Sequence, residues 1–181
     1  MRNISTDNQI LLLVDEADVF SGQYATRKEC HTGNGIHHRA FLVLLENDNK
    51  EVLLQKRKHN LWDDFWDITA TTHPFHLEDR NETYEEAAKR ALQNEMGIKD
   101  VKLKNIGGFN YFAKHGDNCE NEYCAILVGE YNGEVKASPD LVYHYKWMPK
   151  DEFIQECMSS NSSYTPWAIL TGKFLKNMLN L

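Results

Sequence analysis

Three histidines occur at positions from which they could bind one metal ion. His31 and His38 lie seven residues apart in CHTGNGIHH, joined by a glycine-containing loop, and His73 follows the threonines of ITATTHPF. A loop and the strand after it can bring two such rings together, and His73 could supply a third. Neutral imidazole and carboxylate ligands suit zinc, manganese and iron-group ions. A scattered trio of histidines is by itself a weak indication of a metal site.

Two glutamates in CENEYC could complete such a site. Glu120 and Glu122 are two residues apart, so in a strand they project from the same face. Adjacent carboxylates repel each other, and the pKa of one of them rises unless a cation lies between them. A solvated strand face is the ordinary alternative. The residues YCAILV that follow are typical of a core, which places the pair at the entrance of a buried strand.

Glu95 interrupts the apolar face of a helix predicted over residues 83–96. It shares that face with Ala88, Ala91 and Leu92. It also lies in the last helical turn, where the helix dipole disfavours a negative charge. A metal ion at this point would remove both penalties. An Arg or Lys partner, or a position at the edge of the apolar face, is the alternative.

Positive charges occur in two pairs. Arg27 and Lys28 precede the first of these histidines, and Arg57 and Lys58 end a predicted strand. Such groups suit a diphosphate, because guanidinium and ammonium groups bind phosphate oxygens. A solvated strand end is the alternative for each pair taken singly.

The elements that must position these residues are mostly strands, with helices inserted between them. NDNK predicts a hairpin turn, and Thr83 and Glu86 predict a capping box for a helix that ends at Gly97. The pattern indicates an α/β (α+β) protein with a mixed β-sheet. The predicted strands cover residues 10–16, 37–46, 51–57, 65–72, 107–114, 120–131 and 141–148, and the predicted helices cover 83–96, a short segment from 149, and 165–180.

Composition limits the classes of function. The chain has 181 residues, 41% of them hydrophobic, and a net charge of −7, which predicts a single domain over residues 1–181. The charge is spread along the chain, so we expect no nucleic-acid partner, although a local cationic pocket can still bind an anionic substrate. No run of about 18 apolar residues and no signal peptide occurs, so we expect no membrane span. The four sparse cysteines predict reduced thiols and a cytoplasmic protein.

Several motifs occur together in the order of one known family. HHRAF, LLQKR, the tryptophan strand that runs into THP, the helix that ends in NEMGI, the ENE strand and YTPW resemble type I isopentenyl diphosphate isomerase, a branch of the Nudix superfamily. The resemblance covers roughly residues 10–175 and rests on the joint order and spacing of short motifs. It implies a Nudix-type mixed β-sheet sandwiched between helices.

The resemblance also implies two metal positions and a diphosphate site. Magnesium would join the substrate diphosphate to Glu95. Basic residues that grip the diphosphate correspond to Arg27, Arg57 and Lys58. A second divalent ion, zinc or manganese, would be bound by the counterparts of the family's three histidines and two glutamates, which are His31, His38, His73, Glu120 and Glu122.

The family's reaction shifts the double bond of a five-carbon diphosphate by proton transfers on its two sides. A cationic transition state lies between them, and an aromatic face can stabilise it. In the family a cysteine and a metal-supported glutamate exchange the protons. By resemblance, Glu122 corresponds to the glutamate, Trp167 to the aromatic face and Tyr111 to the active-site tyrosine. Thr71 stands at the position of the cysteine, two residues before His73.

The loss of the thiol bears directly on the chemistry. A free cysteine ionises at about pH 8.5, whereas a threonine hydroxyl is far less acidic. General acid–base catalysis contributes roughly 10²–10⁴-fold to rates. Thr71 should therefore weaken isomerisation by the family's usual route.

The predicted helix departs from the Nudix hydrolases. It reads RALQNEMGI where their pattern is REUXEEXGU, so Ala91 and Asn94 replace glutamates. We favour an isomerase-like enzyme of a small isoprenoid diphosphate, in which Thr71 or a water replaces the thiol. A metal-dependent hydrolase of an isoprenoid or nucleotide diphosphate and a non-catalytic diphosphate-binding protein are the alternatives. The partner is a small-molecule diphosphate, and the oligomeric state and the metal identity stay open.

Overall fold

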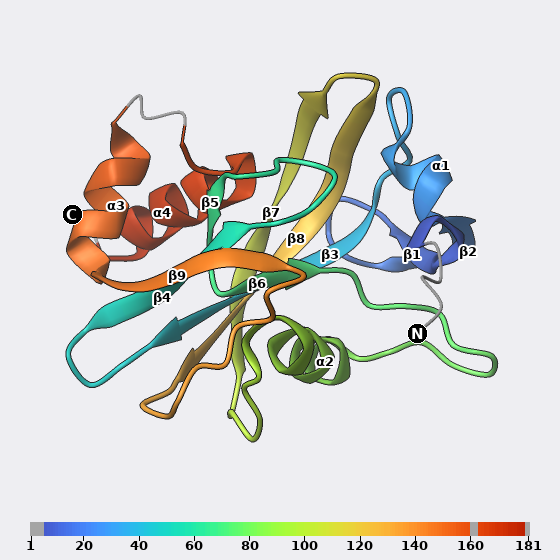
Figure 1. Cartoon of the computed structure of the whole chain (residues 1–181). Coiled ribbons are helices and arrows are strands. Elements are labelled where there is room, and N and C mark those ends of the chain that lie inside the picture. The colour runs from blue at the N-terminus through green and yellow to red at the C-terminus, as the bar shows by residue number, and fades with distance from the viewer. Residues whose placement is uncertain (1–5, 160–162, 180–181) are drawn as a thin grey trace.

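The computed structural model describes residues 6–159 and 163–179, and it arranges them as a large sheet with helices on both faces (Figure 1). None of the described helices is long and apolar enough to span a bilayer. The elements are η1 (Thr6–Asn8), β1 (Ile10–Val14), β2 (Phe20–Thr26), α1 (Arg27–His31), β3 (His38–Glu46), β4 (Glu51–Arg57), β5 (Trp66–Asp67), β6 (Ala70–Thr72), α2 (Tyr84–Met96), β7 (Lys104–His115), β8 (Asn118–Glu130), β9 (Val142–Pro149), α3 (Lys150–Met158) and α4 (Pro166–Leu179).

β3 is the central strand of the sheet. It pairs in parallel with β8 along its whole length, from His38 opposite Glu122 to Glu46 opposite Glu130. The other pairings are antiparallel: β7 with β8, β9 with β4, β5 with β4, and β1, β4 and β6 with β3, while β2 pairs with β1. The mixed sheet of an α+β protein, predicted from the sequence, is therefore confirmed.

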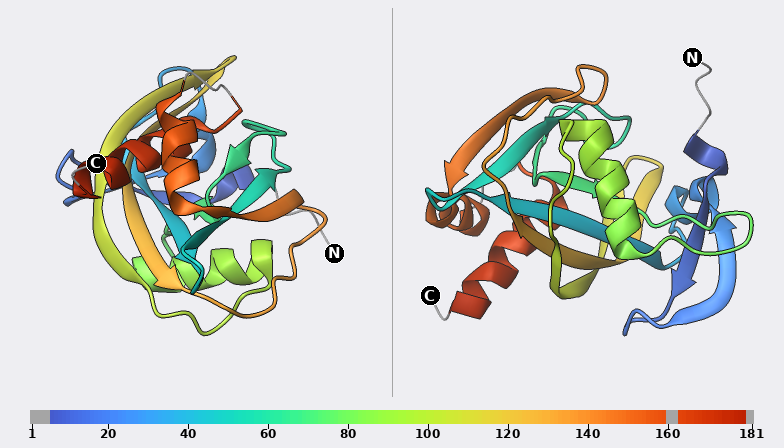
Figure 2. Two further views of the ribbon diagram at one scale, coloured as in Figure 1. Left: turned by 90° about the vertical axis from the view of Figure 1, so that its left-hand side faces the viewer. Right: turned by 90° about the horizontal axis from the view of Figure 1, so that it is seen from below.

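Alternate side chains of β3 enter two separate cores. Ala40, Leu42 and Leu44 pack in a cluster with residues of α3 and α4, among them Phe153 and Trp167. The odd-numbered side chains between them pack against α2. This alternation is the period of two of a strand that is buried on both faces. Figure 2 shows the result, with α2 on one side of the sheet and α3 and α4 on the other.

α2 begins and ends where its sequence predicted. The side chain of Thr83 accepts a hydrogen bond from the backbone N–H of Glu86, and the side chain of Glu86 accepts one from the N–H of Thr83. Gly97 ends the helix in the left-handed conformation, with φ at 66°. The buried face comprises Ala87, Ala88, Ala91, Leu92, Glu95 and Met96. Glu95 is thus a buried carboxylate on an otherwise apolar face.

The strand predicted over residues 65–72 is broken into β5 and β6. β5 pairs with β4, and β6 pairs with β3. At the break, the buried Thr69 hydroxyl donates to the Leu53 carbonyl at 2.8 Å and accepts from the Leu45 N–H at 3.0 Å. These side-chain hydrogen bonds replace ladder bonds while the chain crosses from one neighbour to the other. The break places Asp67 and Thr71 on two separate short strands.

β2 and α1 were not predicted from the sequence. Most of β2 is exposed, so FSGQYAT lacks the apolar alternation that marks a half-buried strand. α1 begins with a capping box between Thr26 and Glu29, and this T-x-x-E spacing is a signal that could have predicted it. α1 matters for the site, because it carries Arg27 and His31.

Candidate active site

Five buried side chains form a cluster with the composition of a metal site. His31, His38, His73, Glu120 and Glu122 each offer one ligand atom, and these atoms all lie within 4.8 Å of one another. They come from α1, β3, the segment after β6, and β8. The parallel register of β3 and β8 sets His38 directly opposite Glu122. The structure therefore brings together donors that are far apart in the sequence.

Backbone carbonyls orient two of the rings. The Nδ1 of His31 lies 3.0 Å from the carbonyl oxygen of Cys119, and the Nδ1 of His38 lies 2.8 Å from that of Ile36. A carbonyl only accepts, so each Nδ1 carries the hydrogen and each Nε2 keeps a free lone pair. The Nε2 of His31 and the Nδ1 of His73 are buried without a hydrogen-bond partner, and the Nε2 of His38 lies 3.3 Å from Glu122 Oε1. Buried lone pairs without partners are what a metal ion would satisfy.

The two carboxylates of the cluster also fit a cation. Burial, and then the charge of Glu122, raises the pKa of Glu120 to about 7. Burial opposes ionisation of Glu122 as well, but contacts with His38 and His73 hold its pKa well below the ordinary value. The Glu120 Oε2 lies 2.9 Å from the Nδ1 of His31. Three imidazoles and two carboxylates in this state fit a divalent ion such as zinc or manganese.

Tyr111 and His73 fix the position of Glu122. The Tyr111 hydroxyl donates to Glu122 Oε2 at 2.6 Å, and the Nε2 of His73 lies 2.8 Å from Glu122 Oε1. Burial, together with the adjacent carboxylates, raises the pKa of Tyr111 well above its ordinary value. Tyr111 therefore stays protonated and acts as a hydrogen-bond donor to this carboxylate.

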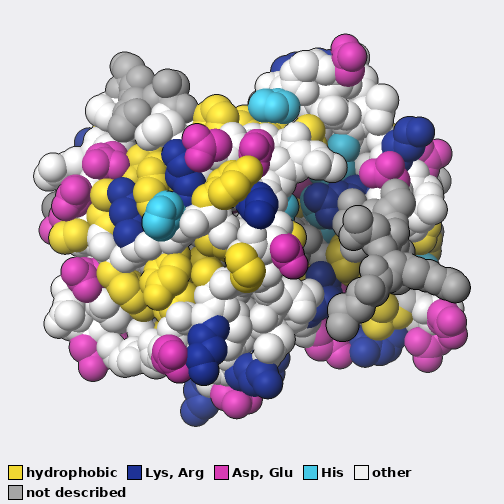
Figure 3. Space-filling model, in the orientation of Figure 1, with side chains coloured by type: hydrophobic (Ala, Val, Ile, Leu, Met, Phe, Trp, Pro, Cys, Tyr) yellow, Lys and Arg dark blue, Asp and Glu magenta, His cyan; other side chains and the backbone are white. Residues whose placement is uncertain are grey.

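A polar cavity of about 450 Å³ adjoins the cluster and shares His31 and Glu120 with it. Arg27 and Arg57 line the same cavity and give it positive charge. In Figure 3, a hollow divides the face in view into a left-hand and a right-hand part, and dark-blue Lys and Arg side chains and cyan His side chains lie in it. A cavity with this charge suits a phosphorylated ligand.

His59, rather than Lys58, reaches this cavity. The Lys58 Nζ donates to the Pro139 carbonyl at 2.8 Å, and Lys58 is not among the described residues that line the cavity. His59 does line it, and its Nε2 is buried without a hydrogen-bond partner. Burial, followed by the charges of Arg57 and Arg27, lowers the pKa of His59 to about 3. His59 was not predicted as a site residue, because a histidine that directly follows an arginine–lysine pair matches no motif spacing.

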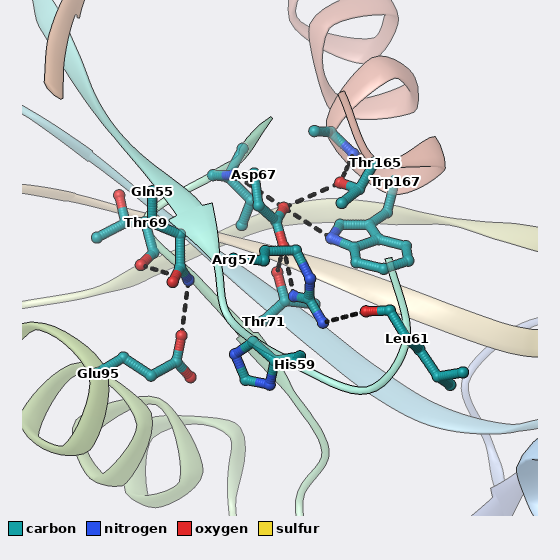
Figure 4. Close-up of polar contacts among 12 residues, drawn as sticks. Gln55, Arg57, His59, Leu61, Asp67, Thr69, Thr71, Glu95, Thr165 and Trp167 are labelled. Carbon is teal, nitrogen blue, oxygen red and sulfur yellow. Dashed lines mark hydrogen bonds and ion pairs between the residues drawn. The ribbon is translucent and has the colours of Figure 1, made fainter. Parts of the chain in front are cut away.

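Glu95 lines the opposite wall of the cavity, on α2. Its side chain accepts a hydrogen bond from the Gln55 Nε2 at 2.7 Å (Figure 4), and the residue is only 5% exposed. Its described polar partner is therefore an amide rather than the Arg or Lys considered from the sequence. Burial raises the pKa of Glu95 to about 7. Glu95 is therefore a buried carboxylate among the residues that line the cavity.

Asp67, which was not predicted as a site residue, contacts several of the predicted residues. Its carboxylate accepts from Arg57 Nη1 and from Trp167 Nε1, each at 2.7 Å (Figure 4). The Arg57 guanidinium carbon lies 5.0 Å from the centre of the Trp167 ring. Trp167 is 2% exposed and packs against Trp62. The aromatic face and the cationic pocket are thus in direct contact.

Thr71 lies at the junction of these groups. It is half-buried, lines the cavity and donates a 3.4 Å hydrogen bond to Asp67. All four cysteines are buried free thiols, and none lines the cavity: Cys30, Cys119, Cys124 and Cys157. Burial raises the pKa of Cys30 and Cys157 to about 12. No thiol is therefore among the residues that line the cavity beside Thr71.

Residues 36–168 match the NUDIX domain family. Two solved structures have a similar fold. DR0079 from Deinococcus radiodurans superimposes with a TM-score of 0.68 at 13% identity, covering 91% of this chain and 98% of that one. The MutT protein from Methanosarcina mazei Go1 gives 0.62 at 15% identity, covering 80% and 96%. The match covers most of the chain, so the protein belongs to the Nudix family.

Relatives named isopentenyl-diphosphate Delta-isomerase resemble the chain over most of its length. The isomerase of Haloarcula marismortui is 32% identical over 148 residues, which cover 78% of this chain and 76% of that protein. The isomerase of Serratia proteamaculans is 28% identical over 171 residues, which cover 93% and 92%. The chain is therefore a member of the isopentenyl-diphosphate isomerase branch of the Nudix family. Arg27 and His31 precede the matched NUDIX segment and lie at the two ends of the N-terminal helix α1.

Proposed function

We propose that the protein is an isopentenyl-diphosphate delta-isomerase-like enzyme that acts on a small isoprenoid diphosphate by proton transfer. The observation that carries the proposal is the junction of two sites. The five-donor cluster shares His31 and Glu120 with a cavity that also contains Arg27, Arg57 and Glu95. The isomerases that resemble the chain over most of its length support the same activity.

The residues of the cavity have distinct roles in substrate binding. The guanidinium groups of Arg27 and Arg57 bind diphosphate oxygens, and Glu95 faces the same anion from α2. When bound, the divalent ion of the cluster neutralises Glu120 and Glu122, while magnesium neutralises the diphosphate. The buried walls exclude water, so that each of these electrostatic contacts is stronger than in solution.

The reaction moves two protons and leaves the composition of the substrate unchanged. The terminal alkene carbon gains a proton, and the allylic carbon nearer the diphosphate loses one. Glu122 exchanges one of these protons, and the Tyr111 hydrogen bond at 2.6 Å holds its carboxylate in place. The Trp167 ring stabilises the positive charge that develops between the two steps. Thr71, directly or through a water, exchanges the other proton in place of the family's thiol.

The test follows three products in one incubation. The metal-loaded protein is mixed with isopentenyl diphosphate and magnesium in deuterated water. We expect dimethylallyl diphosphate that contains deuterium, at a rate roughly 10²–10⁴-fold below that expected with a thiol at position 71. Phosphate or pyrophosphate release without isomerised product would instead identify a hydrolase. Absence of any turnover by fully metal-loaded protein would overturn the catalytic proposal and leave a diphosphate-binding protein.

A further inference from the structure

Asp67 is a fully buried carboxylate that lies outside both the metal cluster and the lining of the polar cavity. We propose that Asp67 is a positioning residue, whose carboxylate holds the diphosphate-binding Arg57 and the aromatic ring of Trp167 in one fixed arrangement and offsets the arginine charge beside that ring. The inference rests on the proposed function, because it gives Trp167 a cationic transition state to face.

The contacts of Asp67 occupy both carboxylate oxygens. Oδ1 accepts from Trp167 Nε1 at 2.7 Å, from the N–H of Ile68 at 2.8 Å and from the Thr165 hydroxyl at 3.1 Å. Oδ2 accepts from Arg57 Nη1 at 2.7 Å and from the Thr71 hydroxyl at 3.4 Å. Figure 4 shows Arg57 of β4, Thr71 of β6 and Trp167 of α4 converging on Asp67. A single side chain therefore ties together the parts that bind substrate.

The surroundings favour the ionised form of this side chain. The N–H groups of Arg57, Trp167 and Ile68 can only donate, so a protonated Asp67 would place its hydrogen among donors. Asp67 also lies at the N-terminus of α4, where Thr165 caps the helix and the helix dipole favours a negative charge. Burial leaves the pKa of Asp67 above its ordinary value, and the charge of Arg57 is the largest of the interactions that oppose burial.

The charge of Asp67 matters for Trp167. The Arg57 guanidinium lies 5.0 Å from the centre of the indole ring, and a cation there opposes a second cation at the same ring. The Asp67 carboxylate is in contact with both groups, so it offsets the arginine charge. A carboxylate on the indole N–H also draws its hydrogen and leaves the ring richer in electrons, which strengthens attraction of a cation to the ring. One tryptophan can thereby adjoin the diphosphate site and still stabilise a carbocation.

Asp67 also orients Thr71. The Thr71 hydroxyl hydrogen points to Asp67 Oδ2, so the oxygen lone pairs are left for the cavity that Thr71 lines. Thr71 therefore presents an acceptor to a substrate or a water in the cavity. This orientation depends on a charged neighbour that was not evident from the threonine run alone.

The closing experiment compares Asp67→Asn with a matched control, Asp64→Asn. Asp64 lies three residues earlier, its side chain is 71% exposed and it pairs with Lys56 at the surface. Both variants remove one carboxylate without changing side-chain volume. We expect Asp67→Asn to lower kcat for isopentenyl diphosphate by about 10–100-fold and to raise KM, whereas Asp64→Asn leaves both within about twofold.

Two further readouts separate positioning from a loss of stability. In a Trp167→Phe background, Asp67→Asn should lower kcat by a smaller factor than in the wild type, because the indole ring that Asp67 holds is no longer present. In proton–nitrogen NMR spectra, the Trp167 indole N–H, assigned by its absence in Trp167→Phe, should move upfield in Asp67→Asn. Equal losses of kcat in both backgrounds, or an indole resonance that does not move, would overturn the inference.

Failure of the proposed function would be recognised separately. If the wild type does not isomerise isopentenyl diphosphate, binding of inorganic pyrophosphate with magnesium replaces turnover as the measurement. Asp67→Asn should then weaken pyrophosphate binding by about tenfold and shift the indole resonance, and unchanged binding would overturn the inference. If Asp67→Asn does not fold, the double variant with Arg57→Gln removes both buried charges and should fold. Its indole resonance, compared with that of Arg57→Gln alone, gives the same test.

Discussion

Removal of divalent ions should lower the thermal stability of the protein in a way that follows from the donor cluster. Its ligand atoms are buried and lie within 4.8 Å of one another. Two of them belong to Glu120 and Glu122, which repel each other when no cation lies between them. An ion that binds only the folded chain stabilises it by RT ln(1 + [M]/Kd), where [M] is the free ion concentration and Kd its dissociation constant.

The size of the effect can be worked out for this chain. At a free ion concentration about 1,000 times Kd, the ion stabilises the fold by about 4 kcal/mol. For a protein of 181 residues, 1 kcal/mol shifts Tm by about 2–4 °C. The loaded protein should therefore melt about 8–16 °C above the stripped protein. Each further tenfold increase in ion concentration adds about 1.4 kcal/mol, or about 3–6 °C.

The assay is calorimetry of protein stripped with a chelator, dialysed, and titrated with zinc or manganese. His144→Ala changes an exposed histidine on β9 and should keep the full dependence of Tm on metal concentration. Glu120→Gln should lose most of that dependence. Its stripped form should stay within about 1 kcal/mol of stripped wild type, because the substitution also removes one of two repelling buried carboxylates.

Two results would refute this reasoning. The first is a stripped protein that melts within about 1 °C of the ion-saturated protein, after elemental analysis has shown that the metal is gone. The second is a Glu120→Gln variant with the wild-type dependence of Tm on metal. Either result would mean that the five donors do not hold an ion that binds the folded state selectively.

Three further predictions concern other parts of the chain. Thr71→Cys should raise the isomerase rate by about 10²-fold or more, since it restores a thiol; an unchanged rate in fully metal-loaded protein would count against the proposed proton transfer. Arg57→Ala should raise KM for the diphosphate and lower the free energy of unfolding in urea by about 3–5 kcal/mol, because the buried Asp67 carboxylate loses its counter-charge. Lys58→Ala changes a residue outside the cavity lining and, as the control, should change neither quantity. Glu86→Gln should lower stability above pH 4.5, and the difference from wild type should vanish toward pH 2. The reason is that the backbone hydrogen bond at the start of α2, followed by Arg80, lowers the pKa of Glu86 to about 2. A stability difference that does not change over this pH range would contradict the prediction.

Much of the fold could be predicted because its signals are local. Thr83, Glu86 and Gly97 define α2 within a single segment, and the apolar run of β3 marks a strand buried on both faces. The break between β5 and β6 could not be predicted in this way. It depends on contacts of Thr69 with Leu45 and Leu53, which lie on other strands.

The candidate site likewise contains residues that could be predicted from the sequence and residues that could not. The resemblance to the isomerases named the five donors, and the structure places their ligand atoms together. Asp67 and Gln55 gave no sequence signal, because their partners lie elsewhere in the chain. Asp67 binds Trp167, 100 residues away, and Gln55 binds Glu95, 40 residues away. Residues that act by holding others become evident only when the tertiary contacts are known.

The parallel pairing of β3 with β8 has a consequence for folding kinetics. Five elements lie between these two strands in the chain: β4, β5, β6, α2 and β7. Pairings of such high contact order form slowly, because a long loop must close first. His38 and Glu122 face each other across this pairing. We therefore expect these two side chains to meet late in folding, so that metal uptake follows formation of the native topology.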